Sequence, residues 1–226
     1  MLSIIIPALN EEKNIGKTLA SIGRCSDGEI IVIDGGSSDG TVQIARSFKA
    51  AVFISQPPRA VQMNKGARAA KGDILLFVHA DTTLPLGFFD RIQTTLSKKG
   101  VVAGAFELGV DHPGKWARLV EKTANWRSRY LQLPYGDQAI FVKKNTFQKY
   151  GGFDNVELLE DLMFIRRLRK YGKIAVARDR VVTSGRRWKR LGVFKTTLIN
   201  QVILAGYLLG FSTPFLKKLY GIGQKR

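Results

Sequence analysis

The stretch IIVIDGGSSDGT, residues 30–41, combines the features that together predict the fold. Its first four residues are apolar and β-branched, as in a strand that is buried on both faces, and Asp34 follows at once. Glycines and serines then predict a turn, and a helix is expected to begin at Thr41. A strand, a polar turn and a helix make up the repeating unit of a sheet of parallel strands.

The same unit recurs through the first hundred residues. Apolar runs rich in Ile and Val predict strands over residues 2–6, 29–33, 51–54 and 73–78. The segments between them have helical spacing, with Ile15, Leu19 and Ile22 on one face of the first. We therefore expect an α/β fold, a doubly wound, mostly parallel sheet with helices on both faces, whose ligands bind beyond the carboxyl ends of the strands.

Charge is unevenly distributed along the 226 residues, whose formal net charge is +18. Residues 161–226 contain 16 Lys or Arg against two acids, which leaves +14 in the last third of the chain. Such an excess favours a negative partner, whether nucleic acid, anionic lipid or a phosphate-bearing substrate. The rest of the composition, 45% hydrophobic and 24% charged, is that of one large globular domain.

The chain has a single cysteine, Cys25, so no disulfide can form within it. No basic segment followed by an apolar one opens the sequence, and both features suit a reducing cytosol. No histidine lies near Cys25 in the sequence, and we expect this residue to have no catalytic role.

Polar side chains follow the predicted strands. Asp34 comes directly after the second strand, while His79 and Asp81 follow the fourth. The first strand is followed by Asn10, Glu11 and Glu12, and Asp39 lies in the turn after the second. Any one of these acids can instead cap a helix or lie near its positive end. For Asp34 and Asp81, each placed after a buried strand, a ligand-binding role is favoured.

The polar turns suit a nucleotide more than a dinucleotide cofactor. A dinucleotide-binding dehydrogenase needs glycines after its first strand, and residues 7–14, PALNEEKN, contain none. Mg²⁺ and Mn²⁺ are typically held by one or two carboxylates together with substrate phosphates, so Asp81 is a candidate metal ligand. His79 can join it on Mn²⁺, bind a ribose hydroxyl, or simply pack.

Five motifs in order resemble the family 2 inverting glycosyltransferases, which have the glycosyltransferase A fold. They are SIIIPALNEEKNI (3–15), IIVIDGGSSDGT (30–41), MNKGARAAKGDILLFVHADTTLP (63–85), GDQAIFVKKNTFQKYGGFD (136–154) and LLEDLMFIRRLRKYG (158–172). The chain is most similar to short bacterial members with an RRW motif near the end and an apolar tail. The resemblance implies a single glycosyltransferase domain, with a helical tail after it. The domain would cover 1–190, divided into a nucleotide-binding half (1–105) and an acceptor half (106–190), and the tail 191–226.

For the donor, the resemblance implies a nucleoside diphosphate sugar and Mn²⁺ or Mg²⁺. Glu11 and Asp34 would line the nucleoside pocket, and Asp81 matches the last position of the family's Asp-x-Asp metal motif. His79 replaces the first aspartate of that motif, which leaves the ribose contact and the choice of metal open. Arg59 is the candidate to replace a base-contacting arginine of many relatives. The other residues of the implied donor site are Pro7, Asn64, Ala80, Arg186, Arg187 and Trp188.

For the acceptor, the resemblance places Asp161 at the catalytic base, which takes the proton of the attacking hydroxyl. Glu160 is the competing candidate, and Asp137 and Gln138 would contact the sugar or the acceptor. The acceptor itself is left open, lipid-linked ones included. Arginine pairs suit the oxygens of a released diphosphate, although adjacent arginines are commonly a solvated pair.

The tail contains an apolar stretch, LINQVILAGYLLGF (198–211), which is too short for the roughly 20 helical residues that span a bilayer. Flanking lysines and arginines favour an interfacial helix on an anionic membrane, and the alternative is a helix packed on the domain or on a second subunit. We expect a cytoplasmic protein bound peripherally to the inner face of the cell membrane.

Two other functions stay open. A basic nucleic-acid-binding module would explain the charge, but the chain has no helix-turn-helix or zinc-finger pattern and its aromatic residues are not interleaved with basic ones. We therefore expect no nucleic-acid partner. A nucleotide-sugar-binding relative that has lost catalysis is kept open by His79.

Overall fold

The computed structural model describes residues 1–23 and 28–224, and Cys25 lies outside them. Within these residues eight strands form one curled sheet in the order β3-β2-β1-β4-β7-β6-β8-β5. The strands are β1 (Leu2–Ala8), β2 (Gly28–Asp34), β3 (Ala51–Ile54), β4 (Ile74–Phe77), β5 (Thr82–Thr83), β6 (Val101–Asp111), β7 (Phe141–Lys143) and β8 (Lys173–Ser184). The helices are α1 (Ile15–Ile22), α2 (Thr41–Ser47), α3 (Arg59–Ala69), α4 (Phe88–Leu96), α5 (Lys115–Tyr130), α6 (Lys144–Lys149), α7 (Glu160–Leu168), α8 (Arg186–Leu191), α9 (Val193–Leu208) and α10 (Thr213–Gln224).

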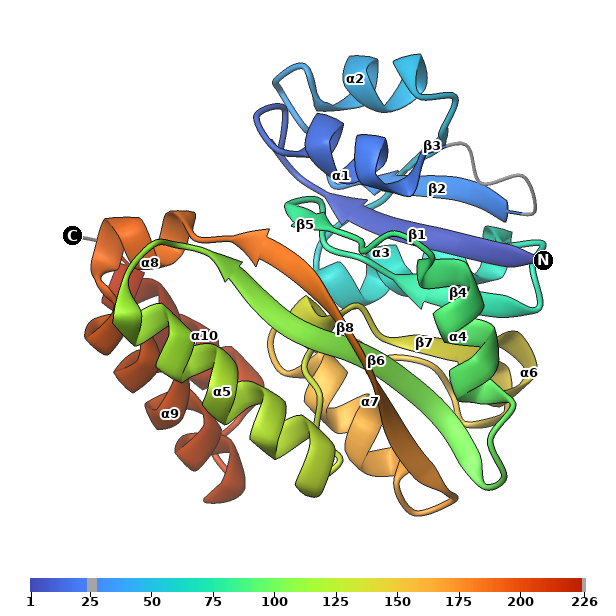
Figure 1. The fold of residues 1–226 in the computed structure, drawn as a ribbon. Coiled ribbons are helices and arrows are strands. Elements are labelled where there is room, and N and C mark those ends of the chain that lie inside the picture. Colours follow the sequence, from blue (N-terminus) through green and yellow to red (C-terminus); the bar gives the residue numbers. More distant parts are fainter. Residues whose placement is uncertain (24–27, 225–226) are drawn as a thin grey trace.

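The first half of the sheet confirms the predicted doubly wound arrangement. β1 pairs in parallel with both β2 and β4, and β2 pairs in parallel with β3. The connecting helices α1, α2 and α3 match the expected helical segments (Figure 1). Every residue of β1 is buried, as its unbroken apolar sequence requires in a strand that has helices on both sides.

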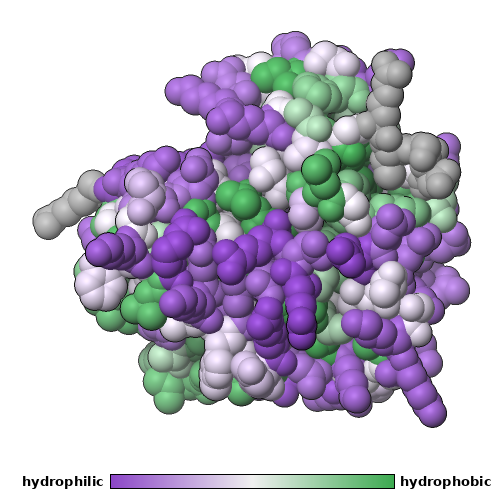
Figure 2. All heavy atoms as spheres, viewed as in Figure 1, coloured by the Kyte–Doolittle hydropathy of each residue, from purple (hydrophilic) through white to green (hydrophobic). Residues whose placement is uncertain are grey.

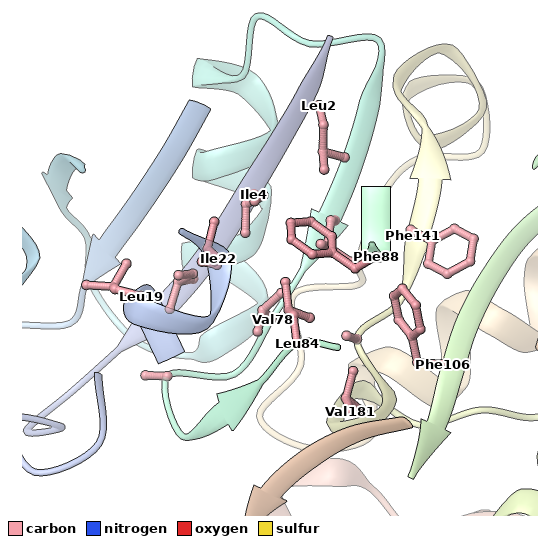
Figure 3. Packing of buried hydrophobic residues seen from close by; sticks show 14 of the residues in the cluster. Leu2, Ile4, Leu19, Ile22, Val78, Leu84, Phe88, Phe106, Phe141 and Val181 are labelled. Atoms are coloured by element: carbon pink, nitrogen blue, oxygen red, sulfur yellow. The ribbon is translucent and has the colours of Figure 1, made fainter. Parts of the chain in front are cut away.

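Two hydrophobic cores lie on opposite faces of the sheet, because successive strand residues point to opposite sides. On β1, Ile4 joins one core with Leu19 and Ile22 of α1, while Ile5 joins the other with Met63 of α3. Figure 3 shows the first core, in which α1 and α4 pack against β1 and the Phe106 and Phe141 rings. The strand ends are thereby held between two layers of helices.

The second half of the sheet is mixed. β7 is antiparallel to both β4 and β6, β5 is antiparallel to β8, and β6 pairs with β8 in parallel. A short 3₁₀ turn, η1 (Gly136–Gln138), precedes β7, and α7 begins at Glu160, where the sequence predicts a helix start. These connections bring η1 and the start of α7 to the carboxyl ends of β1 and β4, as shown by the cavity that they share.

The tail packs on the rest of the chain. α9 lies beside α5 and α10 (Figure 1), and the Trp116 ring of α5 contacts the Phe194 ring of α9 at 4.8 Å between centroids. Lys217 of α10 pairs with Glu157 at 2.8 Å, and the Arg187 guanidinium lies 4.5 Å from the Tyr220 ring centre. Among the described residues no helix is both long enough and apolar enough to cross a bilayer.

Candidate functional site

A cavity of about 570 Å³ opens at the carboxyl ends of β1 and β4. Most of the predicted site residues line it: Pro7, Glu11, Arg59, His79, Ala80, Asp81, Asp137, Asp161, Arg186, Arg187 and Trp188. They come from segments up to 181 positions apart in the chain, Pro7 and Trp188 being the extremes. The sheet therefore gathers the polar strand ends in one place, as parallel strand topology predicts.

At one end of the cavity, Arg186 joins two acids from different strand ends. Its Nη1 donates to Glu11 Oε2 at 2.6 Å, Nη2 pairs with Glu11 Oε1, and Nη2 lies 3.3 Å from Asp81 Oδ2. Asp81 is 16% exposed, and burial raises its pKa although Arg186 acts in the opposite direction. The Asp81 carboxylate faces the cavity, and the bound arginine balances its charge.

Deeper in the cavity, Arg59 connects His79 to the start of α7. Its Nε donates to Glu160 Oε1 at 2.6 Å, and its Nη1 lies 3.2 Å from His79 Nε2. Because a guanidinium only donates, His79 Nε2 accepts this bond and the ring proton is on Nδ1. Burial, with the Arg59 charge beside it, holds the pKa of His79 well below its ordinary value. The imidazole is therefore neutral, and its Nε2 lone pair is already engaged.

Arg59 keeps its charge in this setting. Burial alone would lower its pKa, but the carboxylates of Glu160 and Asp161 outweigh burial and raise it. Its guanidinium lies at the acidic start of α7, so in this structure Arg59 stands beside the proposed chemistry and not at a position where it can replace a base-contacting arginine.

The two adjacent acids at the start of α7 point in different directions. Asp161 lines the cavity, where its Oδ2 accepts from the backbone N–H of Gly136 at 2.5 Å and its Oδ1 from that of Leu162 at 2.7 Å. Glu160 is 2% exposed and is bound to Arg59. The helix N-terminus, which favours negative charge, lies under both. Of the pair, Asp161 is the one that a ligand in the cavity can reach.

Asp137 is a second carboxyl on the same wall. Its Oδ1 is buried and has no hydrogen-bond partner among the described residues. Burial raises the pKa of Asp137 to about 6, with Arg127 acting against the rise and Asp161 adding to it. Arg127 itself lies 3.4 Å from the ring centre of Tyr135, which also faces the cavity. The site therefore holds a carboxyl that titrates close to neutral pH.

Three predicted residues do not reach the cavity. Asp34 is buried and its carboxylate accepts from the backbone N–H groups of Gly36 and Ser37, both at 2.9 Å, so it holds the turn after β2. A nucleoside contact by Asp34 stays a prediction. Asn64 and Gln138 need a correction, because the rest of the chain occupies their amide groups.

Asn64 donates to the carbonyl of Phe153 at 2.8 Å and accepts from its N–H at 3.1 Å, which fixes the Gly152–Phe153 turn against α3. Gln138 is fully buried, donates to the carbonyl of Phe106 at 2.9 Å and accepts from Ser128 at 2.6 Å. Both amides position neighbouring segments and do not face a ligand. A sequence motif does not distinguish the two roles, because each amide finds its partners far away in the chain.

Sequence reasoning missed part of the wall. The tail contributes Asn200, Ile203 and Leu204 from α9 and Tyr220 from α10. Thr183 and Ser184, at the end of β8, and Tyr135, next to the GDQ motif, also line the cavity. Only Tyr135 had a signal in the sequence, since it adjoins a motif, whereas α9 is apolar nearly all around and gives no indication of which face is covered.

The donor set for a divalent ion is small. Among the described residues no three His, Cys, Asp or Glu side chains are close enough to hold a metal by themselves. Asp81 offers one carboxylate facing the cavity, and Mg²⁺ or Mn²⁺ is commonly held by one or two carboxylates plus substrate phosphates. The residues thus fit an ion that binds together with a diphosphate. His79 would need its Nδ1, or release from Arg59, to become a second ligand.

Comparison with known proteins identifies the family. The family model described as glycosyl transferase family 2 matches residues 3–155, which is more than half of the chain. The chain belongs to this family. The match contains Glu11, Asp81 and Asp137 of the cavity wall and ends before Asp161 and the tail. A resemblance of the RRW motif and the tail to short bacterial members thus stays a prediction.

Individual family 2 relatives are more distant. The chain is 29% identical over 171 residues to "Glycosyltransferase AglE" of Haloferax volcanii, a stretch covering 68% of this chain and 56% of that protein. A "Glucosyl-3-phosphoglycerate synthase" of Mycolicibacterium paratuberculosis is 35% identical over 100 residues, which cover 39% of this chain and 30% of the relative. The chain thus spans about half the length, or less, of these curated relatives.

Solved structures confirm the glycosyltransferase A fold. The mannosyltransferase PcManGT from Pyrobaculum calidifontis, in complex with GDP-Man and Mn²⁺, superposes with a TM-score of 0.65 at 18% identity, covering 97% of this chain and 68% of that one. The glucosyl-3-phosphoglycerate synthase from Mycobacterium tuberculosis, with Mn²⁺ and UDP, gives a TM-score of 0.62 at 21% identity, over 88% of this chain and 78% of that one. At such identities the likeness shows the family 2 chain's fold alone.

Proposed function

We propose that this chain is a metal-dependent, inverting glycosyltransferase that transfers a sugar from a nucleoside diphosphate sugar to the hydroxyl of an acceptor. The observation that carries the proposal is the placement of Asp81 and Asp161 on one cavity, with Arg186 and Arg187 beside them. Family membership supports the reaction class, and the Mn²⁺ and nucleotides bound to similar structures support the donor and the metal.

The donor diphosphate is assigned to the end of the cavity that holds Asp81 and Arg186. Asp81 would hold Mn²⁺ or Mg²⁺ together with the diphosphate oxygens, and the ion would neutralise charge on the leaving diphosphate. Arg186, now shared between Glu11 and Asp81, has a fork that suits phosphate oxygens. Trp188, on the same wall, offers a ring on which a base or sugar can stack.

Asp161 is assigned the role of general base. The acceptor oxygen forms its bond to the anomeric carbon as the bond to the diphosphate breaks on the opposite face, and Asp161 takes the acceptor's proton. Two backbone N–H groups, those of Gly136 and Leu162, fix the carboxylate in place. Asp137, 24 residues earlier, is assigned a contact with the transferred sugar or the acceptor, because it faces the same space.

The organisation around this site is also a proposal. We assign residues 1–190 to one catalytic domain and propose that the tail, residues 191–226, holds the protein against the inner face of a cell membrane. A lipid-linked acceptor fits that position, and association through the tail helices is the alternative arrangement. The basic charge of these helices supports the membrane contact.

A thermal-shift screen of nucleoside diphosphates and their sugars, with and without Mn²⁺, tests the proposal. A bound donor at a hundredfold excess over its dissociation constant should stabilise the fold by about 2.7 kcal/mol. Asp81→Ala should abolish the part of this shift that depends on Mn²⁺, whereas Leu86→Ala, at an exposed loop position, should not change it. Metal-dependent stabilisation that persists in Asp81→Ala would contradict the assignment of the metal ligand.

A further inference from the structure

α5 carries a row of large apolar side chains that face solvent. Trp116, Leu119, Trp126 and Tyr130 are all exposed, the last to 70%, and their spacing of three, seven and four residues keeps them on one side of the helix. The opposite side of α5 is buried against β6 through Ala117 and Ala124. Nothing among the described residues covers the outer row, and the proposed glycosyl transfer gives it no role.

A second row continues the first. On α9, Phe194, Leu198 and Val202 are four residues apart and exposed, Leu198 to 63%. The ring contact between Trp116 and Phe194 joins the two rows. Figure 1 shows α5 and α9 side by side, and apolar and intermediate colours gather over this flank in Figure 2. We call these seven side chains the docking face: Trp116, Leu119, Trp126, Tyr130, Phe194, Leu198 and Val202.

The charge around the docking face is of one sign. Residues 186–226 contain nine Lys or Arg and no Asp or Glu. On α5 the one acid, Glu121, is buried and bound to Arg118, whereas Lys115 and Lys122 are exposed. A second copy of this chain would bring the same positive surface against itself. An anionic surface is the complementary partner.

The shape of the helices indicates a contact along a membrane and not across it. α9 has 16 residues, fewer than the roughly 20 that cross the hydrocarbon layer. Tryptophan and tyrosine are enriched at the level of lipid headgroups, because their rings are apolar with a polar edge. The face thus combines the three components of an interfacial site: aromatic rings, aliphatic side chains and surrounding lysines.

We propose that the docking face binds the surface of an anionic lipid bilayer, with α5 and α9 lying in the plane of the headgroups. This deepens the membrane contact proposed above for the tail, because it adds α5, which is part of the catalytic domain. The inner side of α9 supplies Asn200, Ile203 and Leu204 to the cavity wall, so a docked molecule carries its cavity at the membrane surface.

Vesicle flotation of the purified full-length protein tests the proposal. Vesicles of phosphatidylcholine and phosphatidylglycerol in equal parts should carry the wild type, and pure phosphatidylcholine should carry much less. Trp126→Ser and Leu198→Ser should each lower the partition coefficient about tenfold, since each removes one exposed apolar anchor. Leu86→Ser, which removes a 96% exposed leucine on another loop, is the matched control and should bind like the wild type.

Fluorescence gives a second measurement that does not depend on a loss of binding. The chain has three tryptophans, at 116, 126 and 188. A variant in which Trp126 is the sole tryptophan, made by Trp116→Phe and Trp188→Phe, should be quenched by vesicles of brominated anionic lipid. Absence of quenching, or flotation unchanged by Trp126→Ser, would overturn the role of α5.

Two further outcomes are distinguishable. A dimer in sedimentation that Trp126→Ser converts to monomer, without vesicle binding by the wild type, would show that a second copy covers the face and would overturn the proposal. Nucleoside diphosphate binding, measured by thermal shift in Trp126→Ser, should equal that of the wild type. Failure of the wild type to bind any nucleoside diphosphate would refute the proposed function, while flotation would still decide the docking face.

Discussion

Replacing Asp137 by asparagine should raise the free energy of unfolding at neutral pH and leave it unchanged in acid. The Asp137 carboxyl has a pKa of about 6 in the folded protein and 3.8 as its ordinary value, because burial disfavours the charged form. Below both values the carboxyl is neutral in both states and contributes nothing. As the pH rises from about 4 to about 6, the unfolded chain ionises first, so the folded state loses relative stability.

The size of this effect follows from the shift in pKa. A difference of about two units corresponds to about 3 kcal/mol at pH 7 and to about half of that near pH 5. Asp137→Asn keeps the shape of the side chain and removes the ionisation, so it should recover up to this amount at neutral pH. The unpartnered Oδ1 is consistent with such a penalty, since no described hydrogen bond offsets the burial.

Urea unfolding of the wild type and of Asp137→Asn, measured at several pH values between about 4 and 8, isolates this group, because the other titrating residues are common to both proteins. The stability difference should grow with pH and level off above about 6. A difference that is the same at every pH would refute the reasoning. In parallel, sugar transfer by the variant should fall if Asp137 contacts the sugar or the acceptor, so a more stable protein would be a poorer enzyme.

The remaining predictions concern the base and the core. Asp161→Asn should lower the transfer rate roughly 10² to 10⁴-fold with near wild-type donor binding, whereas Glu160→Gln should mainly lower the stability by weakening the buried pair with Arg59; transfer at the wild-type rate in Asp161→Asn would disprove the assignment. Gly66→Ala should destabilise the fold by about 1 to 3 kcal/mol in thermal unfolding, because the added carbon would overlap Ile5 of β1, and Gly16→Ala, with its nearest contact at 3.6 Å, should be neutral or stabilising by up to about 1 kcal/mol; equal effects of the two would argue against close packing under α3.

The sequence predicts the parallel half of this protein well because period and position carry the information locally. A run such as residues 2–6 is long enough to form a strand, apolar enough to be buried on both faces, and followed at once by polar residues. The placement of Glu11 and Asp81 on one cavity then follows from the parallel pairing of β1 with β4.

The limits of that prediction are equally physical. Gln138 was expected in the site because it stands beside Asp137, but its amide is used by Phe106 and Ser128, whose nearness only the folded chain determines. The same holds for Arg59, whose two partners at 79 and 160 are remote in the sequence. The helix α9 gave no signal for its cavity-facing side, because a helix that is apolar on most sides does not show which side is covered.

The cavity wall also has a consequence for how the protein is made. Pro7, near the start of the chain, and Tyr220, near its last described residues, face the same space. On the ribosome the parallel half, which pairs only strands from the first 77 residues, can form early, but the pocket then lacks the wall that α9 and α10 provide. A nascent chain can thus acquire most of its sheet long before it has a closed pocket, and synthesis that stops before residue 200 would leave a folded sheet with an open, incomplete site.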